Sequence, residues 1–536
     1  MDSLTHPSSD VASRASLALS LTTAVTTSRS LGRGALKVNV TGLSLVNGPK
    51  PTVATYEALA RIAAGQDPLE ATALLDSLID SAVVAGTDGT VHVLRSGASP
   101  VRLFARQFEE TIEITDDLPV RTSELRRGWL TFQMAHGILS PFDRRGSLQT
   151  VLPGYVAIPP GSLVSLRPGR PPRRWTLDHS RGPESDCDRH EAEQAVHAGL
   201  DRAILRNLET APRDAIIAFE LSGGMDSTVI AARTRSLMRK HGDPRKTASF
   251  SLVYPFHEFR HEPTYIAAAA AHAGVPNTRL DGAASLPFAD WSDPGPRPVG
   301  PEPALQQVGR KQLETTLRAA CAETGSAVLF HGQGGDTLFG FGPARQFHVG
   351  RLPDRPRWIG RRAWDHFQAE WKAMQACFPD TLEGHRRQYY SGANIDDGWC
   401  DWVLTRGIDG FRACGFTDAG LLRAVGRLWS FEPETDRVPY KAIQRRVFSA
   451  ELPDPIRMRS HKIPYDGLYV RGYRRSGARL FALVDSQAEM LANEGIEPGS
   501  IRLAIERLIA GNLDHDVLLS MVLASLEWLE MTQTSL

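Results

Sequence analysis

A glycine-rich loop between an apolar strand and a helix is the feature that most constrains this chain. The loop reads SGGMDST at residues 222–228, follows the apolar run IIAF, and leads directly into the helical pattern VIAARTRSLM. Gly223 and Gly224 let backbone N–H groups approach an anion without a Cβ in the way. The start of the helix adds free N–H donors and the positive end of a dipole. The pattern therefore predicts a phosphate-binding turn.

The polar side chains of the same loop indicate which kind of anion site it forms. Ser222, Ser227 and Thr228 supply hydroxyl donors, whereas the carboxylate of Asp226 would repel a phosphate. A hard cation such as Mg²⁺, bridging Asp226 to phosphate oxygens, resolves this conflict. Because the loop is not GxxxxGK[ST], the pattern disfavours an enzyme that transfers a γ-phosphate.

A second glycine motif reads VLFHGQGGDTLFG at residues 328–340. Its apolar part predicts a strand that delivers His331, Gly332, Gln333 and Asp336 to the carboxyl end of a sheet. Ligands of open parallel sheets bind at that edge. Asp226 and Asp336 are therefore predicted to flank one metal–phosphate site.

The two halves of the chain differ in hydrophobic pattern. Residues 36–185 read mainly as short strands, with two helices predicted between residues 55 and 84 and a strand pair in VLPGYVAIPPGSLVSL. The Pro/Arg-rich stretch at 167–175 predicts an exposed linker. From about residue 190, apolar strands alternate with helices, as in a parallel α/β sheet. Beyond about residue 355 the pattern is largely helical.

We therefore predict an α/β protein with three parts: a flexible N-terminal segment at 1–35, a first domain at 36–185, and a second domain at 186–536 with a helical C-terminal extension. The 61 Lys and Arg residues balance 61 Asp and Glu residues, which excludes a global polycation that coats nucleic acid. Five cysteines without a CxxC pair support neither a disulfide scaffold nor a structural zinc site. They indicate a cytoplasmic compartment.

No run approaches the roughly 18 apolar residues of a membrane span. The segment ASLALSLTTAV at 15–25 lacks the flanks of an export signal.

The first loop resembles the pyrophosphate loop of the N-type ATP pyrophosphatases, which cleave ATP between its α and β phosphates. Together, the two motifs resemble the asparagine synthetase superfamily, whose synthetase domain carries SGGxDS and then a GxGxDE-like motif. The resemblance covers residues from about 190 to 475. It implies an adenine-nucleotide α-hydrolase-like fold, ATP and Mg²⁺ as cofactors, and Asp226 and Asp336 as metal ligands. The ATP-binding residues that it implies are Ser222, Gly223, Gly224, Asp226, Ser227, Leu252 and Gly332.

The same resemblance gives two lysines a role. Lys441, in YKAIQRRVF, is similar to the family's phosphate-contacting lysine ahead of a helix. Lys462, in SHKIPYDG, is similar to the lysine that stays beside the acyl phosphate during amide formation. A fixed cation would stabilise negative charge in both steps, and losing one such donor typically costs about 3–4 kcal/mol of barrier.

Three departures from the family pattern bear on the substrate. Glutamine-dependent members carry a cysteine just after Met1, whereas Asp2 follows Met1 here. The N-terminal half resembles the glutaminase fold and is therefore predicted to be a catalytically inactive copy. Gln333 stands where the resemblance places Glu in asparagine synthetases and Tyr in β-lactam synthetases, and Thr337 replaces the final acid of GxGxDE. Both changes suggest an acyl acceptor other than that of asparagine synthetases.

An amine already present on the substrate is the simplest alternative to channelled ammonia. Two branches close rings in this way, the β-lactam synthetases and the lasso-peptide cyclases. The segments SLVYPF, EPTYIAAAAAHAG and HKIPYDGLYVRGYRRSG are more similar to those of the cyclases. We therefore predict an AMP-forming ligase that adenylates an Asp or Glu side chain of a precursor peptide and closes an isopeptide ring with that peptide's N-terminal amine. His331, Gln333 and Tyr465 are expected to contact the substrate.

The expected partners are the precursor peptide and a leader-peptide protease of the same pathway, without nucleic acid or membrane. The alternatives are a small-molecule β-lactam-type synthetase and an ammonia-using asparagine synthetase. A tRNA-thiolating pyrophosphatase would need a basic RNA-binding appendage or paired cysteines. A non-enzymatic binding protein would have little reason to keep Asp226. The peptide sequence, ring size, general base and oligomeric state stay open.

Overall fold

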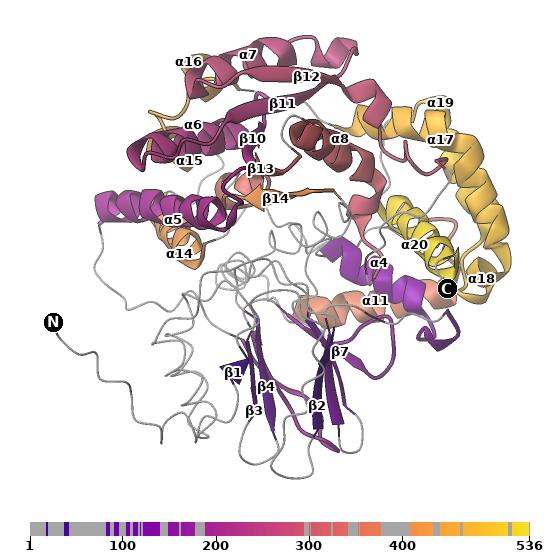
Figure 1. Ribbon diagram of the computed structural model, residues 1–536. Helices are drawn as coiled ribbons and strands as arrows, with labels where there is room; N and C mark the ends of the chain where they lie inside the picture. Colours follow the sequence, from indigo (N-terminus) through magenta and orange to yellow (C-terminus); the bar gives the residue numbers. More distant parts are fainter. Residues whose placement is uncertain are drawn as a thin grey trace, which may run out of the picture.

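The computed structural model describes most of residues 188–534 and shorter parts of the N-terminal region (Figure 1). The described ranges are 18–19, 37–41, 82–85, 90–95, 103–107, 111–115, 118, 122–139, 148–159, 162–176, 188–293, 300, 302–322, 325–340, 352, 354–376, 408–416, 418–432, 440–460, 465–512 and 517–534. The predicted segment 1–35 lies outside the described residues except at 18–19. The predicted boundary at 185 also lies outside them, so the domain division stays a prediction.

A five-stranded parallel sheet forms the centre of the synthetase-like region. Its strands run in the order β12 (Asn277–Asp281), β11 (Thr247–Val253), β10 (Ile216–Glu220), β13 (Ala327–His331) and β14 (Gly410–Cys414). All four neighbouring pairs are parallel. The order runs outward from β10 in both directions, so the topological switch point lies between β10 and β13. Ligands of such sheets bind in the crevice beyond that point.

Both faces of this sheet are buried, which explains the continuous apolar runs of its strands. Ile217 and Phe219 of β10 belong to a core that includes α5 (Arg189–Thr210), α6 (Met225–Lys240) and α14 (Ala419–Ser430). Ile216 and Ala218 face the other way and share a core with Leu317 of α8 (Arg310–Ala322). Figure 1 shows these helices on either side of the sheet. The predicted parallel α/β sheet is confirmed.

Two smaller sheets form a sandwich in the N-terminal region. One has the strand order β1-β3-β4-β8-β9 and the other β2-β6-β5-β7. Apolar side chains of β4, β5, β6, β7 and β8 make up their common core. The bounds are β1 (Ala18–Leu19), β2 (Lys37–Thr41), β3 (Ala82–Ala85), β4 (Val91–Arg95), β5 (Leu103–Gln107), β6 (Thr111–Thr115), β7 (Tyr155–Ile158), β8 (Ser162–Leu166) and β9 (Arg173–Thr176).

Three sequence predictions for this region are corrected. The stretch predicted as helical ends in strand β3, and its earlier part, up to residue 81, lies outside the described residues. Strands β7 and β8 were predicted as a pair, but they join different sheets. The predicted linker at 167–175 is partly strand, because β9 pairs antiparallel with β8. Hydrophobic alternation reveals strands but not which strands pair, so these errors concern pairing and boundaries.

The helical C-terminal part packs against a helix of the N-terminal region. Helix α4 (Trp129–Leu139) contacts α11 (Arg361–Ala376) and α20 (Val517–Thr534). The ring centroids of Trp129 and Trp528 lie 5.9 Å apart within one large core. That core therefore holds residues from both sides of the predicted boundary. The remaining helices are α7 (Glu262–Ala273), α9 (Gly335–Phe339), α15 (Ala442–Val447), α16 (Asp454–Arg457), α17 (Asp466–Ser486), α18 (Ala488–Asn493) and α19 (Pro498–Ala510). The helical extension is thus confirmed.

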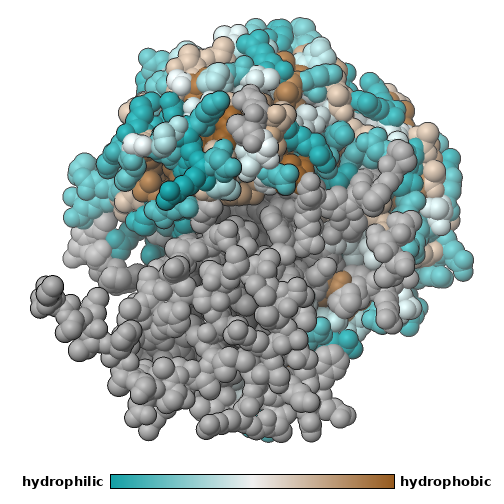
Figure 2. All heavy atoms as spheres, viewed as in Figure 1, coloured by the Kyte–Doolittle hydropathy of each residue, from teal (hydrophilic) through white to brown (hydrophobic). Residues whose placement is uncertain are grey.

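Among the described helices, none combines the length and apolar character that a membrane crossing requires. Figure 2 shows a mainly hydrophilic surface over the parallel-sheet region, with hydrophobic residues in small, separate groups.

Candidate active site

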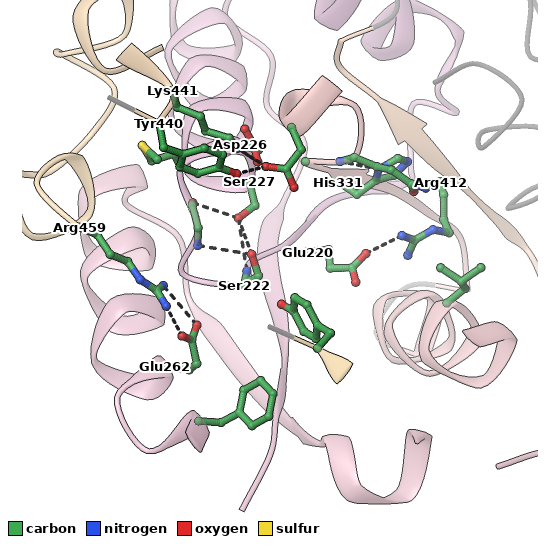
Figure 3. Close-up of a pocket in the computed structure, with 18 residues that line it drawn as sticks. Glu220, Ser222, Asp226, Ser227, Glu262, His331, Arg412, Tyr440, Lys441 and Arg459 are labelled. Carbon is green, nitrogen blue, oxygen red and sulfur yellow. Dashed lines mark hydrogen bonds and ion pairs between the residues drawn. The ribbon is translucent and has the colours of Figure 1, made fainter. Parts of the chain in front are cut away.

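A cavity of about 400 Å³ lies beyond the carboxyl ends of the central strands. Its walls include the loop after β10 and the loop after β13, so it occupies the crevice at the switch point. Side chains that follow α14 and lead into α17 close it (Figure 3). Ionisable groups of both signs line it, and their arrangement decides what the cavity can hold.

Hydrogen bonds with its own hydroxyl groups fix the conformation of the loop after β10. The Ser222 backbone N–H donates to Ser227 Oγ at 3.3 Å, and Thr228 Oγ1 donates to the Gly224 carbonyl at 2.7 Å. Gly224 begins α6 with no side-chain cap. Gly223 has a φ of +71°, in the left-handed region that favours glycine. The N-terminus of α6 therefore faces the cavity with backbone donors, as an anion site requires.

The second glycine loop packs directly on the first. A Cβ at Gly332 would lie 2.5 Å from the Ser227 backbone nitrogen. A Cβ at Gly335 would overlap the carboxylate of Asp226. Glycine is required at both positions because the two loops touch there. This contact explains how two motifs more than a hundred residues apart share one site.

Lys441 joins the acidic residues of the two loops. Its Nζ forms an ion pair with Asp226 Oδ2 and lies 2.9 Å from Asp336 Oδ1. Gln444 Nε2 donates to the other oxygen of Asp226 at 2.9 Å, and the Tyr440 hydroxyl donates to Asp336. Burial, together with the bond to Asp336, raises the pKa of Tyr440 far above its usual value, so the phenol stays protonated. The Lys441 side chain is only 3% exposed, so this charge is fixed in place.

The backbone also fixes Lys441. The residue adopts a left-handed conformation with φ +57° at the start of α15, and its N–H donates to the Gly340 carbonyl at 2.8 Å. Gly340 directly follows the helix that carries Asp336. The loop with Lys441 is therefore attached to the second motif by main chain as well as by charge.

The two carboxylates suit the Mg²⁺ that the family resemblance implies. They converge on a single ammonium group, so one cation already lies within reach of both. The Asp336 side chain is 47% exposed, which leaves it accessible from the cavity. Mg²⁺ is commonly bound by one or two carboxylates together with substrate phosphates and water. Among the described residues no cluster of three or more His, Cys, Asp or Glu is found, so phosphate oxygens would have to complete the coordination.

Arg459 braces the first glycine loop from the opposite side. Its Nη1 donates to the Gly223 carbonyl at 3.3 Å, and its guanidinium pairs with Glu262 at the start of α7. The guanidinium carbon lies 4.2 Å from the centroid of the Tyr265 ring. Arg445 donates to the Arg459 carbonyl at 2.6 Å and so holds the segment in place. Figure 3 shows the Arg459–Glu262 pair apart from the cluster around Lys441.

Arg459→Lys is expected to raise the KM for ATP about tenfold in ATP–pyrophosphate exchange. An ammonium cannot reproduce the planar contacts that the guanidinium makes with a carbonyl, a carboxylate and a ring at once. Arg457→Lys is the matched control, because among the described residues that side chain pairs with Asp454, three residues earlier and 80% exposed. An unchanged KM in the Arg459 variant would show that the brace is dispensable.

A second group of polar side chains lies on the α8 side of the sheet. Arg412 of β14 pairs with Glu220 of β10 at 2.7 Å and donates to Thr316 of α8 at 3.2 Å. His331 of β13 lies between these strands and is buried. The Gln333 backbone N–H donates to His331 Nδ1 at 3.2 Å. Burial, and next the Arg412 guanidinium, lowers the pKa of His331 well below its usual value, so the ring is neutral.

This lowered pKa predicts acid sensitivity of the fold. The unfolded His331 takes up a proton near pH 6.5 while the folded residue stays neutral, so stability falls as the pH drops below about 6.5. The contribution is at most about 1.4 kcal/mol per pH unit. His331→Asn keeps an acceptor for the Gln333 N–H and should lose less melting temperature than the wild type between pH 7 and pH 5. Equal losses would contradict the prediction.

The structure brings together most of the residues that the sequence predicted. Those that line the cavity are Ser222, Gly224, Asp226, Ser227, His331, Gly332, Gln333, Asp336, Lys441 and Tyr465. Gly223 lies just behind the lining and packs on Tyr265. Leu252 is not among the lining residues and instead packs against a small core with Tyr254 and Phe259. Lys462 lies outside the described residues, so its predicted role stays a prediction.

Sequence reasoning missed several residues of the cavity wall. They are Glu220, Met225, Phe259, Glu262, Leu313, Arg412, Tyr440 and Arg459. Two of them had a signal in the sequence, because Met225 lies within the first glycine motif and Tyr440 is the neighbour of Lys441. The others come from separate elements.

A comparison with known families bears on this site. Residues 196–399 match the asparagine synthase family. The match includes both glycine loops and supports the asparagine synthetase superfamily, whose members are ATP-dependent ligases that form C–N bonds and generally use Mg²⁺. It stops before β14, Lys441 and Arg459. The lasso-peptide branch and the inactive glutaminase-like region stay predictions. No curated protein matches the chain.

Proposed function

We propose that this chain is an AMP-forming amide ligase that closes an isopeptide ring in a precursor peptide. One observation carries the ligase part of this proposal. Asp226 and Asp336 both form ion pairs with Lys441 beside a phosphate loop. The peptide part rests on the segments that resemble lasso-peptide cyclases and on Gln333 in place of an acid. Gln333 lines the cavity, where its amide can donate and accept hydrogen bonds but cannot take up a proton.

The proposed reaction has two steps. An Asp or Glu side-chain carboxylate of the peptide attacks the α-phosphate of ATP, which forms an acyl adenylate and releases pyrophosphate. The N-terminal amine of the same peptide then attacks the acyl carbon, loses a proton, and displaces AMP. Holding amine and acyl group together can supply roughly 7–11 kcal/mol of the barrier.

Different residues of the cavity would serve different parts of this reaction. Backbone N–H groups at the start of α6, with the hydroxyls of Ser222 and Ser227, would bind the departing pyrophosphate. Lys441 would stabilise negative charge at the α-phosphate, because its buried ammonium is already fixed beside the loop. Asp226 and Asp336 would hold Mg²⁺, which when bound neutralises phosphate charge. Neutral His331 and Gln333 would orient the acyl group.

Peptide-stimulated exchange between ATP and labelled pyrophosphate tests the proposal. The full chain would be incubated with a library of synthetic peptides, each with a free amino terminus and one internal Asp or Glu. We expect exchange that depends on peptide, formation of AMP, and a peptide product that has lost one water. Free aspartate with ammonia is the comparison substrate. Exchange with aspartate but not with peptides would instead favour an asparagine synthetase, and exchange with neither would contradict the proposal.

A further inference from the structure

The Glu220–Arg412 pair presents its negative member to the cavity. Both residues line the cavity, but the Glu220 side chain is 25% exposed and the Arg412 side chain only 3%. Arg412 is held from behind by Thr316 of α8. Figure 3 shows the pair separated from the Lys441 cluster. The buried cation therefore keeps a carboxylate in place at the cavity wall.

The other acids of the described cavity wall already have functions in the proposed site. Asp226 and Asp336 share Lys441 beside the phosphate loop and would hold Mg²⁺, and Glu262 pairs with Arg459, which braces that loop. Next to Glu220, neutral His331 adds no positive charge. The α8 side of the cavity is therefore suited to a cation or a hydrogen-bond donor. It is a poor place for the phosphates, which the α6 side receives.

Aromatic rings complete the surroundings of Glu220. Phe259 and Tyr465 line the cavity, with ring centroids 6.0 Å apart, and Tyr254 lies 5.1 Å from Phe259. Burial raises the pKa of Tyr254, and the nearby Glu220 carboxylate adds to that rise. A carboxylate beside aromatic rings is a favourable setting for an ammonium group, because ring faces attract cations too.

We propose that Glu220 binds the acceptor amine of the substrate as its ammonium form. This inference rests on the proposed function, in which the peptide's N-terminal amine must reach the acyl adenylate. The ion pair would draw the amine into the α8 side of the cavity while the phosphates occupy the α6 side. Glu220 is a binding residue for the second half-reaction only. The bound ammonium then releases one proton to water, and the neutral amine attacks the acyl carbon and displaces AMP.

Glu220→Gln separates this role from adenylation. The amide has nearly the same shape and can still accept a bond from Arg412. Because the substitution removes the charged partner of the substrate's ammonium, we expect ring closure to slow by about 10-fold to 100-fold. Pyrophosphate exchange, the KM for ATP, and trapping of the acyl adenylate by hydroxylamine should stay within about twofold, because none of them needs the amine site. Glu193→Gln is the matched control, since Glu193 also pairs with an arginine at 2.7 Å, is 24% exposed, and is not among the residues lining the cavity.

A second measurement uses the wild type and needs no variant to fold. Peptides that have a free amino terminus but lack Asp and Glu cannot be adenylated, and they should inhibit ring closure more strongly than the same peptides acetylated at that terminus. Glu220→Gln should erase this difference. Equal inhibition of the wild type by the two kinds of peptide, or ring closure by Glu220→Gln at the wild-type rate, would overturn the amine site and leave the ligase proposal standing. A raised KM for ATP in Glu220→Gln would instead assign Glu220 to the nucleoside. No exchange by the wild type with any peptide would refute the proposed function and this inference together.

Discussion

Asp226→Asn is expected to lower peptide-stimulated pyrophosphate exchange by about a hundredfold to a thousandfold. The change removes one of two carboxylates that meet at Lys441 and leaves its shape intact. Removing a preorganised electrostatic group from a catalytic site typically costs about this much. Lys441 keeps its 2.9 Å contact with Asp336, so the fold should persist. The exchange rate and the melting temperature, measured on the same preparation, separate the two effects.

Asp454→Asn serves as the control, because that carboxylate is 80% exposed and pairs only with Arg457. It should retain wild-type exchange. A fully active Asp226→Asn variant would show that the two carboxylates do not form the metal–phosphate site. If the chain were a non-enzymatic binding protein, partner binding would persist in the variant and there would be no exchange to lose.

Gly332→Ala is expected to damage both stability and catalysis. The added Cβ would lie 2.5 Å from the Ser227 nitrogen and 2.9 Å from the Asp226 carbonyl carbon, which are backbone atoms that cannot turn aside. Overpacking of this kind costs typically 1–3 kcal/mol. Separating the two loops would also move Asp226 away from Asp336. We expect a melting temperature lower by several degrees and at least about a tenfold loss of exchange, a factor that corresponds to about 1.4 kcal/mol.

The matched control is Gly499→Ala in helix α19. A Cβ there would meet nothing closer than the Glu497 carboxylate at 3.6 Å, and alanine favours a helix over glycine by up to about 1 kcal/mol. This variant should therefore be as stable as the wild type or slightly more stable. If Gly332→Ala behaved like Gly499→Ala, the contact between the loops would not be required.

The parallel sheet could be predicted because its central strands are continuous apolar runs followed by glycine turns. Strand β12 could not, because it is an edge strand whose residues NTRLD are mostly exposed or half-buried. Strand β14 was also missed, since GFRAC is short and lies in a region of helical pattern. Helix α4 escaped notice because its residues 129–135 are all buried and so lack the one-sided pattern of a surface helix.

The residues of the site also include some whose proximity could be predicted from the sequence and some whose proximity could not. Asp226 and Asp336 follow glycine turns on adjacent strands, so their proximity follows from the topology. Glu220 ends β10 and Arg412 lies in the middle of β14, two strands that β13 separates, and nothing in their spacing relates them. Arg459 reaches the phosphate loop from a segment that the family pattern does not mark. Such contacts depend on the packing of distant elements and become visible only in the folded chain.

The packing of α4 against the C-terminal helices constrains how the chain can be made and divided. The Glu494 carboxylate accepts bonds from the backbone N–H groups of Gly128 and Leu130, across 366 residues in the first case. Partial burial at this junction raises the pKa of the carboxyl group. During synthesis α4 must wait for most of the remaining polypeptide before its apolar faces are covered. A ribosome-bound chain would therefore expose Trp129 for longer than its place in the sequence suggests, and a recombinant fragment ending before α20 would leave the same surface open to aggregation.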